Sequence, residues 1–240
     1  MIDLKIHTQP DDESCGPTSL HAIYRYYGYD IELEQVVKSV ERSFSGGTLS
    51  PLLGKHALQH GFQAKIYINS LDVFDPSWFY SDQGKTCQDM LISKLKAQMR
   101  YKTSKGITQA SRAYLEYLEL GGQIYFYTLS VQLLRQYFIK KIPILTGLSA
   151  TYLYRSSRER FTKKGESIYD DIRGTPCGHF VVLCGYEPEK RVIVVADPHR
   201  ENPISHDNYY KVSSNSLINA ILLGVFTHDA NLLIIQPKEL

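Results

Sequence analysis

Apolar residues recur at helical spacing over the first quarter of the chain. Such stripes predict helices over 15–27, 32–40 and 51–60. In the first of them, Leu20 and Ile23 belong to the stripe that would face a core. Glycines follow the first and third stripes, as is typical of helix ends. The opening of the chain is therefore expected to form a helical layer.

Alternating patterns and turn residues dominate the second half of the chain, which indicates a sheet. Strands are expected over 62–68, 124–128, 142–148, 179–184, 191–196, 225–226 and 232–235, with helices over 131–139 and 216–223. Residues 2–7 alternate weakly and are expected to form a short strand or an extended entry. Pro143 cannot donate to a strand ladder, so we expect its strand to begin at a sheet edge or a bulge. The polar stretch 149–177 is expected to be a long loop that acts as a flap over a substrate groove.

The segment 72–122 is the least informative part of the sequence. Amphipathic patterns over 87–101 and 108–120 predict a pair of helices that ends at Gly121. We interpret the chain as one domain over 1–240 with a helical insertion at about 72–122. The pair could cover one side of a cleft or extend the core, and the structural role is favoured.

Composition narrows the class of protein. The apolar fraction of 43% is ample for a buried core, and a formal charge of +2 argues against nucleic acid or an anionic membrane as partner. No run of 18 apolar residues occurs, and the start of the chain does not have the pattern of a signal peptide. The four cysteines are few and irregularly spaced, which favours a reducing compartment and a cytoplasmic location.

Cys15 is the candidate nucleophile. It follows turn-forming acidic residues and opens the first helix, where free N–H groups and the helix dipole stabilise a thiolate. Pro17 suits the first turn of a helix, and Gly16 would let the backbone approach a bound carbonyl closely.

Three further residues complete a candidate acyl-transfer site. Gln9, six positions before Cys15, carries an amide that can donate to an oxyanion. His179 opens a strand, and Asp197 ends the next one, so a hairpin would bring the carboxylate beside the imidazole and orient it. These residues are proposed as a Cys-His-Asp triad with a glutamine oxyanion hole.

Each of these residues alone has a more ordinary interpretation. A lone cysteine at a helix start is more often a small buried residue, and Asp-Pro is common turn chemistry, but their joint occurrence favours a site. Cys177 and His179 do not predict zinc, because no second pair stands at ligand spacing. No metal or cofactor is therefore expected.

Tyrosines gather near the candidate site. Most of the eighteen tyrosines are expected to serve the core and its rim. The cluster of Tyr152, Tyr154, Tyr209 and Tyr210 could instead line a peptide groove. We predict substrate contacts at Gly16, Gly178, Tyr152 and Tyr154.

At these positions the chain resembles the papain-like cysteine peptidases, and within them the C39 and C39-like group. The resemblance rests on Gln9, Cys15-Gly16, His179 and Asp197-Pro198, which match the motif of the group position for position. It implies an α+β fold with an N-terminal helical layer on a C-terminal antiparallel sheet, and a bacterial source. Ser14 departs from the Asp that many members have there, and Gly178 departs from the bulkier or polar residues that are common before the histidine.

The expected function is hydrolysis of a peptide or isopeptide bond in a peptide or protein substrate. The chain carries neither membrane spans nor a Walker motif, so a freestanding member is the nearer comparison. Two alternatives stay open: an acyltransferase or amidase on the same scaffold, and a catalytically silent domain that binds peptides. The substrate sequence and the oligomeric state cannot be predicted from the sequence.

Overall fold

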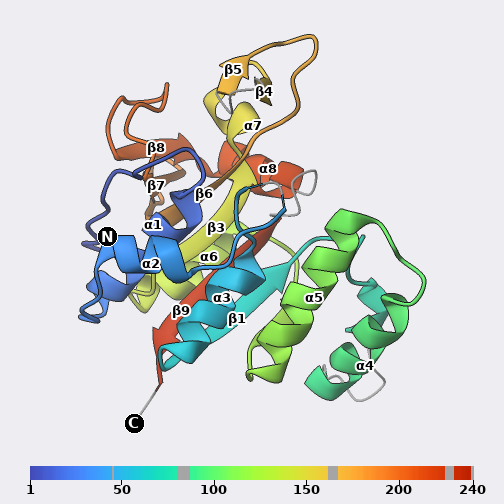
Figure 1. Cartoon of the computed structure of the whole chain (residues 1–240). Helices are drawn as coiled ribbons and strands as arrows, with labels where there is room; N and C mark the ends of the chain where they lie inside the picture. Colours follow the sequence, from blue (N-terminus) through green and yellow to red (C-terminus); the bar gives the residue numbers. More distant parts are fainter. Residues whose placement is uncertain (45, 80–86, 162–166, 225–229, 239–240) are drawn as a thin grey trace.

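A seven-stranded sheet forms the centre of the molecule (Figure 1). The computed structural model describes residues 1–44, 46–79, 87–161, 167–224 and 230–238. The strand order is β2-β1-β9-β3-β6-β7-β8, and every neighbouring pair is antiparallel except β1 and β2. The strands of this sheet are β1 (Phe62–Ile68), β2 (Gln123–Phe126), β3 (Ile144–Ser149), β6 (Gly178–Glu187), β7 (Val192–Ala196), β8 (Tyr209–Ser213) and β9 (Asn231–Pro237).

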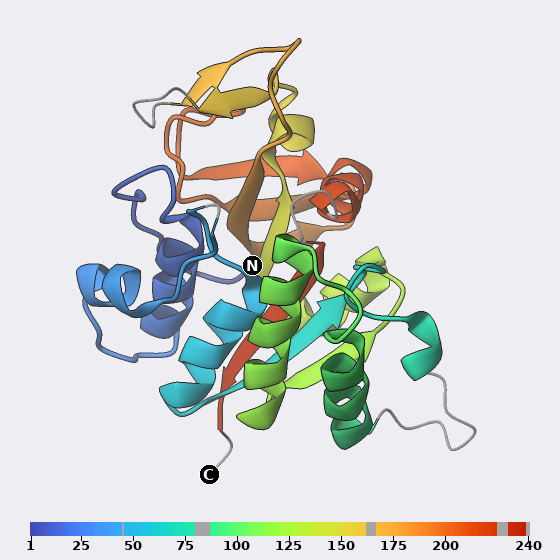
Figure 2. The same ribbon diagram turned by 45° about the vertical axis from the view of Figure 1, so that its right-hand side comes forward.

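Helices cover both faces of this sheet (Figures 1 and 2). They are α1 (Cys15–Tyr26), α2 (Leu33–Ser39), α3 (Ser50–Gln59), the 3-10 helix η1 (Pro76–Trp78), α4 (Gln88–Gln98), α5 (Lys105–Glu119), α6 (Val131–Ile139), α7 (Ala150–Tyr154) and α8 (Ser214–Leu223). The central strands are apolar on both sides: Val182 and Cys184 of β6 pack with the N-terminal helices, whereas Val181 and Leu183 pack with α6 and α8. Period-two alternation therefore divides the core into two clusters.

Helix α1 is fixed against β6 by burial and by one polar contact. Leu20, Ile23 and Tyr24 are buried, as the helical stripe predicts. The hydroxyl of Ser19 donates to the carbonyl of Phe180 at 3.3 Å. The first turn of α1 therefore lies beside the beginning of β6, so the fold brings Cys15 near His179.

The segment between β1 and β2 is part of the core. Because these two strands are parallel, the chain needs a long crossover between them, which η1, α4 and α5 provide. Leu91, Leu95 and Tyr117 are buried in the cluster that includes α1 and α3. The Tyr117 hydroxyl also donates to the carbonyl of Ala64 at 2.7 Å. The helical pair thus extends the core, while its status as an insertion in a single domain stays a prediction.

Two expectations about the second half are wrong. Strand β3 lies between β9 and β6 in the middle of the sheet, because its ladder begins at Ile144 and so never requires an N–H from Pro143. The stretch 149–177 is not an irregular loop: it contains α7 and the hairpin of β4 (Glu159–Phe161) and β5 (Ser167–Tyr169). The hairpin stands at the end of the sheet where β6 begins (Figure 2), and its role as a flap stays a prediction.

The predicted fold class is confirmed. The protein is α+β, with helices first and a mostly antiparallel sheet after them. Two features refine the expectation: β1 comes from the N-terminal half, and α6 and α8 cover the second face of the sheet. The strand expected at 225–226 lies outside the described residues.

Candidate active site

His179 and Asp197 meet at one end of the hairpin formed by β6 and β7. Val182 pairs with Ala196 in the ladder, so the residues just beyond this pair extend toward the same end of the sheet. His179 Nε2 and Asp197 Oδ1 are 2.7 Å apart, and both side chains are buried. The structure therefore brings together the two residues that the sequence places 18 positions apart.

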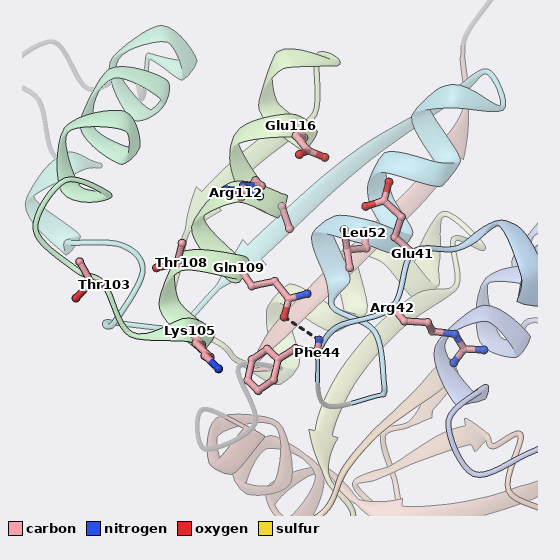
Figure 3. A pocket seen from close by; sticks show the side chains of 11 residues that line it. Glu41, Arg42, Phe44, Leu52, Thr103, Lys105, Thr108, Gln109, Arg112 and Glu116 are labelled. Carbon is pink, nitrogen blue, oxygen red and sulfur yellow. Dashed lines mark hydrogen bonds between the residues drawn. The ribbon is translucent and has the colours of Figure 1, made fainter.

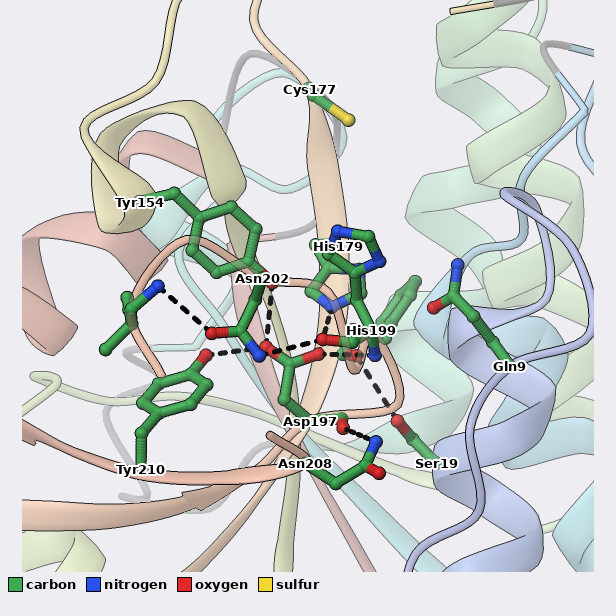
Figure 4. Close-up of polar contacts among 12 residues, drawn as sticks. Gln9, Ser19, Tyr154, Cys177, His179, Asp197, His199, Asn202, Asn208 and Tyr210 are labelled. Atoms are coloured by element: carbon green, nitrogen blue, oxygen red, sulfur yellow. Dashed lines mark hydrogen bonds and ion pairs between the residues drawn. The ribbon is translucent and has the colours of Figure 1, made fainter. Parts of the chain in front are cut away.

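Asp197 is held by hydrogen bonds on both carboxylate oxygens (Figure 4). The hydroxyls of Tyr154 and Tyr210 donate to Oδ2 at 2.7 and 2.6 Å. The backbone N–H of His199 donates to Oδ1 at 2.8 Å, beside the bond from His179. Burial alone would raise the pKa of Asp197, but the His179 charge and these hydrogen bonds lower it. The carboxylate is thus stabilised in its charged form.

The environment of His179 favours the imidazolium. Burial alone would lower the pKa of His179, but the carboxylate of Asp197 and the side chain of Cys15 together raise it above its ordinary value. Cys15 contributes through charge and through a hydrogen bond to the imidazole. Because Nε2 faces Asp197, Nδ1 is the nitrogen left for the sulfur. Cys15, His179 and Asp197 therefore form one connected group.

Cys15 is half-buried at the first residue of α1, as predicted. The loop before it is held by polar contacts: the buried hydroxyl of Ser14 donates to Asp11 Oδ1 at 2.6 Å and accepts from Arg42 at 3.2 Å. An aspartate at position 14 would place a second carboxylate against Asp11. The departure at Ser14 is therefore compatible with an ordered loop.

Gln9 lies beside the turn that carries Asp197. Its backbone N–H donates to the carbonyl of Pro198 at 2.9 Å, which fixes the glutamine loop to the turn that carries Asp197. Its Nε2 donates to the carbonyl of Asp11 at 2.9 Å. An amide has two N–H groups, so this bond fixes the side chain and leaves one donor for a ligand. Gln9 Oε1 is buried and has no partner among the described residues.

The four residues predicted to contact substrate have different surroundings. Gly16 is buried, and a Cβ there would lie 2.5 Å from Thr48 Cγ2, so its missing side chain faces protein instead of an open cleft. Gly178 pairs with Ser149 at the start of β6. Tyr152 and Tyr154 line a hollow of about 730 Å³.

The four tyrosines of the cluster have different contacts. The hydroxyls of Tyr154 and Tyr210 are engaged by Asp197, as described above, and that of Tyr209 donates to the carbonyl of Leu4 at 3.2 Å. Of the two tyrosines at this hollow, Tyr152 is 41% exposed and Tyr154 is half-buried. The idea that all four tyrosines line a peptide groove is thus wrong for Tyr210, which is buried, and stays a prediction for Tyr209, which is 38% exposed. Substrate contacts at the four predicted positions stay predictions.

Sequence reasoning missed the residues that orient Asp197. Tyr210 is buried on β8, and His199 places its ring 6.3 Å from that of His179, centroid to centroid. The amide of Asn208 donates to the carbonyl of Asp197 at 2.7 Å. The available signals were the position of His199 directly after the Asp-Pro pair, that of Asn208 just before the next strand, and the place of Tyr210 on that strand within the tyrosine cluster.

The described part of the chain offers no separate metal centre and no membrane span. No group of three or more histidine, cysteine, aspartate or glutamate side chains within the described ranges is arranged to hold a metal ion. Among the same residues, every helix is too short or too polar to cross a bilayer.

A half-buried thiol at a helix start, joined to a buried histidine and carboxylate on neighbouring strands, defines a papain-like arrangement. Residues 1–218 match the model of the Peptidase_C39 like family, so the chain belongs to this family of cysteine peptidases. The resemblance drawn from the motif is therefore confirmed. No curated protein sequence matches the chain.

Three of the solved structures that match the chain come from bacteria. The chain is 12% identical to the peptidase domain of Streptococcus ComA, a bi-functional ABC transporter involved in quorum sensing, over 98% of this chain and 99% of that one, with a TM-score of 0.44. It is 15% identical to a putative C39-like peptidase from Bacillus anthracis, over 99% and 96%, with a TM-score of 0.45. Xylellain, a cysteine protease from Xylella fastidiosa, is 13% identical over 100% and 85%, with a TM-score of 0.44. Because these scores lie below 0.5, family membership rests on the family model.

Proposed function

We propose that this protein is a cysteine peptidase that hydrolyses a peptide or isopeptide bond. Cys15 is the nucleophile, His179 the acid and base, Asp197 the residue that orients the imidazole, and Gln9 an oxyanion donor. The observation that carries the proposal is the buried contact of 2.7 Å between His179 and Asp197, with the side chain of Cys15 close enough to raise the pKa of the same imidazole. A domain that only binds peptides has no need of such a group.

The reaction follows from the positions of these side chains. His179 holds the proton of Cys15, and the thiolate adds to the amide carbonyl of the substrate. The backbone N–H of Cys15, at the first residue of α1, has no helical carbonyl to donate to, and it binds the oxyanion together with the second N–H of Gln9. His179 then protonates the leaving amine. Water attacks the thioester, and the acid product and the free thiol are released.

The carboxylate of Asp197 keeps the imidazole in one orientation during these steps. Its bond to His179 Nε2 leaves Nδ1 facing the sulfur, and the bonds from Tyr154 and Tyr210 prevent rotation of the carboxylate. Asp197 therefore acts through the imidazole and does not touch the substrate.

Turnover of a synthetic decapeptide library, followed by mass spectrometry, tests the proposal. The wild-type chain is expected to cut a subset of peptides and, in ¹⁸O-labelled water, to leave one ¹⁸O atom in each new carboxyl terminus. Cys15→Ala and His179→Ala should give no products, with unchanged circular dichroism.

Added hydroxylamine distinguishes hydrolysis from transfer. A hydrolase forms labelled acids whether or not an amine is present, whereas a transferase forms products only when an amine such as hydroxylamine accepts the acyl group from the thioester. Products that appear only with the amine would contradict hydrolysis while retaining Cys15 chemistry. Equal cleavage by wild type and Cys15→Ala would contradict the assignment altogether. The cytoplasmic location stays a prediction.

A further inference from the structure

A second hollow lies between α5 and the loop that joins α2 to α3 (Figure 3). Its volume is about 580 Å³. Leu52 and Ala113 give it an apolar floor, and Phe44, whose side chain is 68% exposed, stands at its rim. The backbone N–H of Phe44 donates to Gln109 Oε1 at 3.1 Å, which joins the loop to α5. We call this space the α5 hollow.

The α5 hollow carries a surplus of positive charge. Its two carboxylates, on Glu41 and Glu116, both bind Lys55, at 2.5 and 2.6 Å. Lys105 and Arg112 line the hollow seven positions apart, which places them on one face of α5. Within the part of the chain that the structure describes, neither forms an ion pair. Two exposed cations are therefore available to a ligand.

The α5 hollow is connected to the loop that precedes the nucleophile. Arg42, which lines the hollow, donates to the carbonyl of Glu13 and, at 3.2 Å, to the hydroxyl of Ser14. On the same loop, Thr48 lies against Gly16 at the first turn of α1. The loop that forms one wall of the hollow thus also contacts the residues on either side of Cys15.

We propose that the α5 hollow binds an acidic segment of the peptide substrate. An apolar side chain would lie over Leu52 and Ala113, with a neighbouring Asp or Glu beside Lys105 and Arg112. The proposal rests on the proposed function and adds a preference for acidic peptides to it. A free anion would leave the apolar floor uncovered, and a nucleic acid strand would bring phosphates against Glu41 and Glu116.

Peptide selection on a variant without the nucleophile tests the proposal. Cys15→Ala, as the full chain, is immobilised and exposed to a synthetic library of acetylated decapeptides. We expect enrichment of peptides in which Asp or Glu adjoins Leu, Ile or Phe. The affinity of a selected peptide is then measured by fluorescence anisotropy, beside its Asp→Asn or Glu→Gln form.

Two double variants in the Cys15→Ala background supply the comparison. Lys105→Gln with Arg112→Gln removes the cations of the α5 hollow and should weaken the acidic peptide about tenfold at low salt, and less at high salt. Lys94→Gln with Arg100→Gln removes two exposed cations from α4 and the residues after it, which do not line the hollow. This control changes net charge equally and should alter affinity less than twofold.

Three outcomes would overturn the proposal: no selected peptides, selection without acidic residues, or equal weakening by both double variants. The same experiment separates this proposal from the proposed function, because binding is measured without Cys15. Binding that depends on Lys105 and Arg112, in a protein whose wild type cleaves nothing, would support the hollow and contradict the peptidase. Cleavage that depends on Cys15, together with binding that does not depend on Lys105 and Arg112, would support the peptidase and contradict the role of the hollow.

Discussion

The hydroxyl of Tyr210 donates a hydrogen bond of 2.6 Å to Asp197 Oδ2, the carboxylate oxygen that does not face His179. Strand β8 thereby supports the active-site hairpin from its edge. The contact is buried and involves a charged acceptor, so its loss leaves a lone pair of the carboxylate unsatisfied.

Tyr210→Phe should therefore lower the free energy of unfolding by about 2 kcal/mol at pH 7. The ring is retained, so the change reports the hydroxyl alone. Chemical denaturation measures it, with Tyr101→Phe as the control because Tyr101 is 85% exposed. A loss no larger than that of the control would show that the hydroxyl does not stabilise the carboxylate.

Asp197→Asn should move the titration of His179 to lower pH. The carboxylate raises the pKa of the imidazole against the effect of burial, so a neutral amide leaves burial dominant. The imidazole signals of the Cys15→Ala protein, followed by NMR with and without Asp197→Asn, measure the midpoints. An unchanged midpoint would contradict the role assigned to Asp197.

The alkaline limb of the peptidase pH profile should move in the same direction. His179 must be protonated, because the imidazolium stabilises the thiolate of Cys15 and supplies the proton to the leaving amine. Because its pKa is raised, wild-type activity should persist above the ordinary imidazole range, and Asp197→Asn should lose activity at lower pH. Initial rates of one library substrate across pH 6 to 10 test this, and identical limbs would refute it.

Gln9→Ala should lower kcat about a hundredfold with little change in KM. The amide is fixed by its bond to the Asp11 carbonyl, and its second N–H would contact the oxyanion only as that charge develops. Steady-state kinetics measure the effect, with Gln9→Glu as a variant of similar shape that cannot donate. Rates within threefold of wild type for both variants would remove Gln9 from the oxyanion hole.

Gly16→Ala should destabilise the protein by about 1–3 kcal/mol. The added Cβ would lie 2.5 Å from Thr48 Cγ2, well inside contact distance. Thr48→Ser removes that methyl group and keeps the hydroxyl that donates to the Glu41 carbonyl at 2.9 Å. The double variant should therefore recover much of the loss in thermal denaturation, and an absence of recovery would place the clash elsewhere.

Stability should fall in mild acid because of His56. Its Nδ1 contacts the Tyr24 hydroxyl at 2.7 Å and its Nε2 contacts the Ser39 hydroxyl at 2.9 Å, and burial lowers its pKa to about 4. The unfolded imidazole takes up a proton near pH 6.5, as free histidine does. Between these values the unfolded state binds more protons, so stability declines as pH falls from about 6.5 toward 4. His56→Gln should lose this part of the slope in urea titrations at each pH, and an equal slope would contradict the assignment.

Local patterns predicted most of the individual elements. The strand over Phe62–Ile68 and the helix over Val131–Ile139 have the expected bounds. Polar and apolar residues alternate clearly along the strand, and apolar residues recur at helical spacing along the helix. Ser130 caps this helix by accepting from the N–H of Leu133 at 3.3 Å. The pairing of His179 with Asp197 was also predictable, because a tight hairpin relates them.

Contacts between distant segments were not predictable from local patterns. β9, at the end of the chain, lies between β1 and β3, with Leu233 opposite Ile66. The two tyrosines that donate to Asp197 come from α7 and β8. The periodicity of the sequence does not reveal that these two elements lie close together in space. The elements within 149–177 were missed because they are only three to five residues long, too short to show a period.

The most direct test of the central claim is the alkylation rate of Cys15 by iodoacetamide at pH 6. Cys15→Ser serves as the blank for the other thiols, of which Cys184 is buried with its pKa raised to about 12. If His179 holds the Cys15 proton, the wild-type thiol should react at least tenfold faster than the same thiol in His179→Ala, since only the thiolate attacks. Equal rates in the two proteins would contradict the cysteine-histidine pair and, with it, the proposed peptidase.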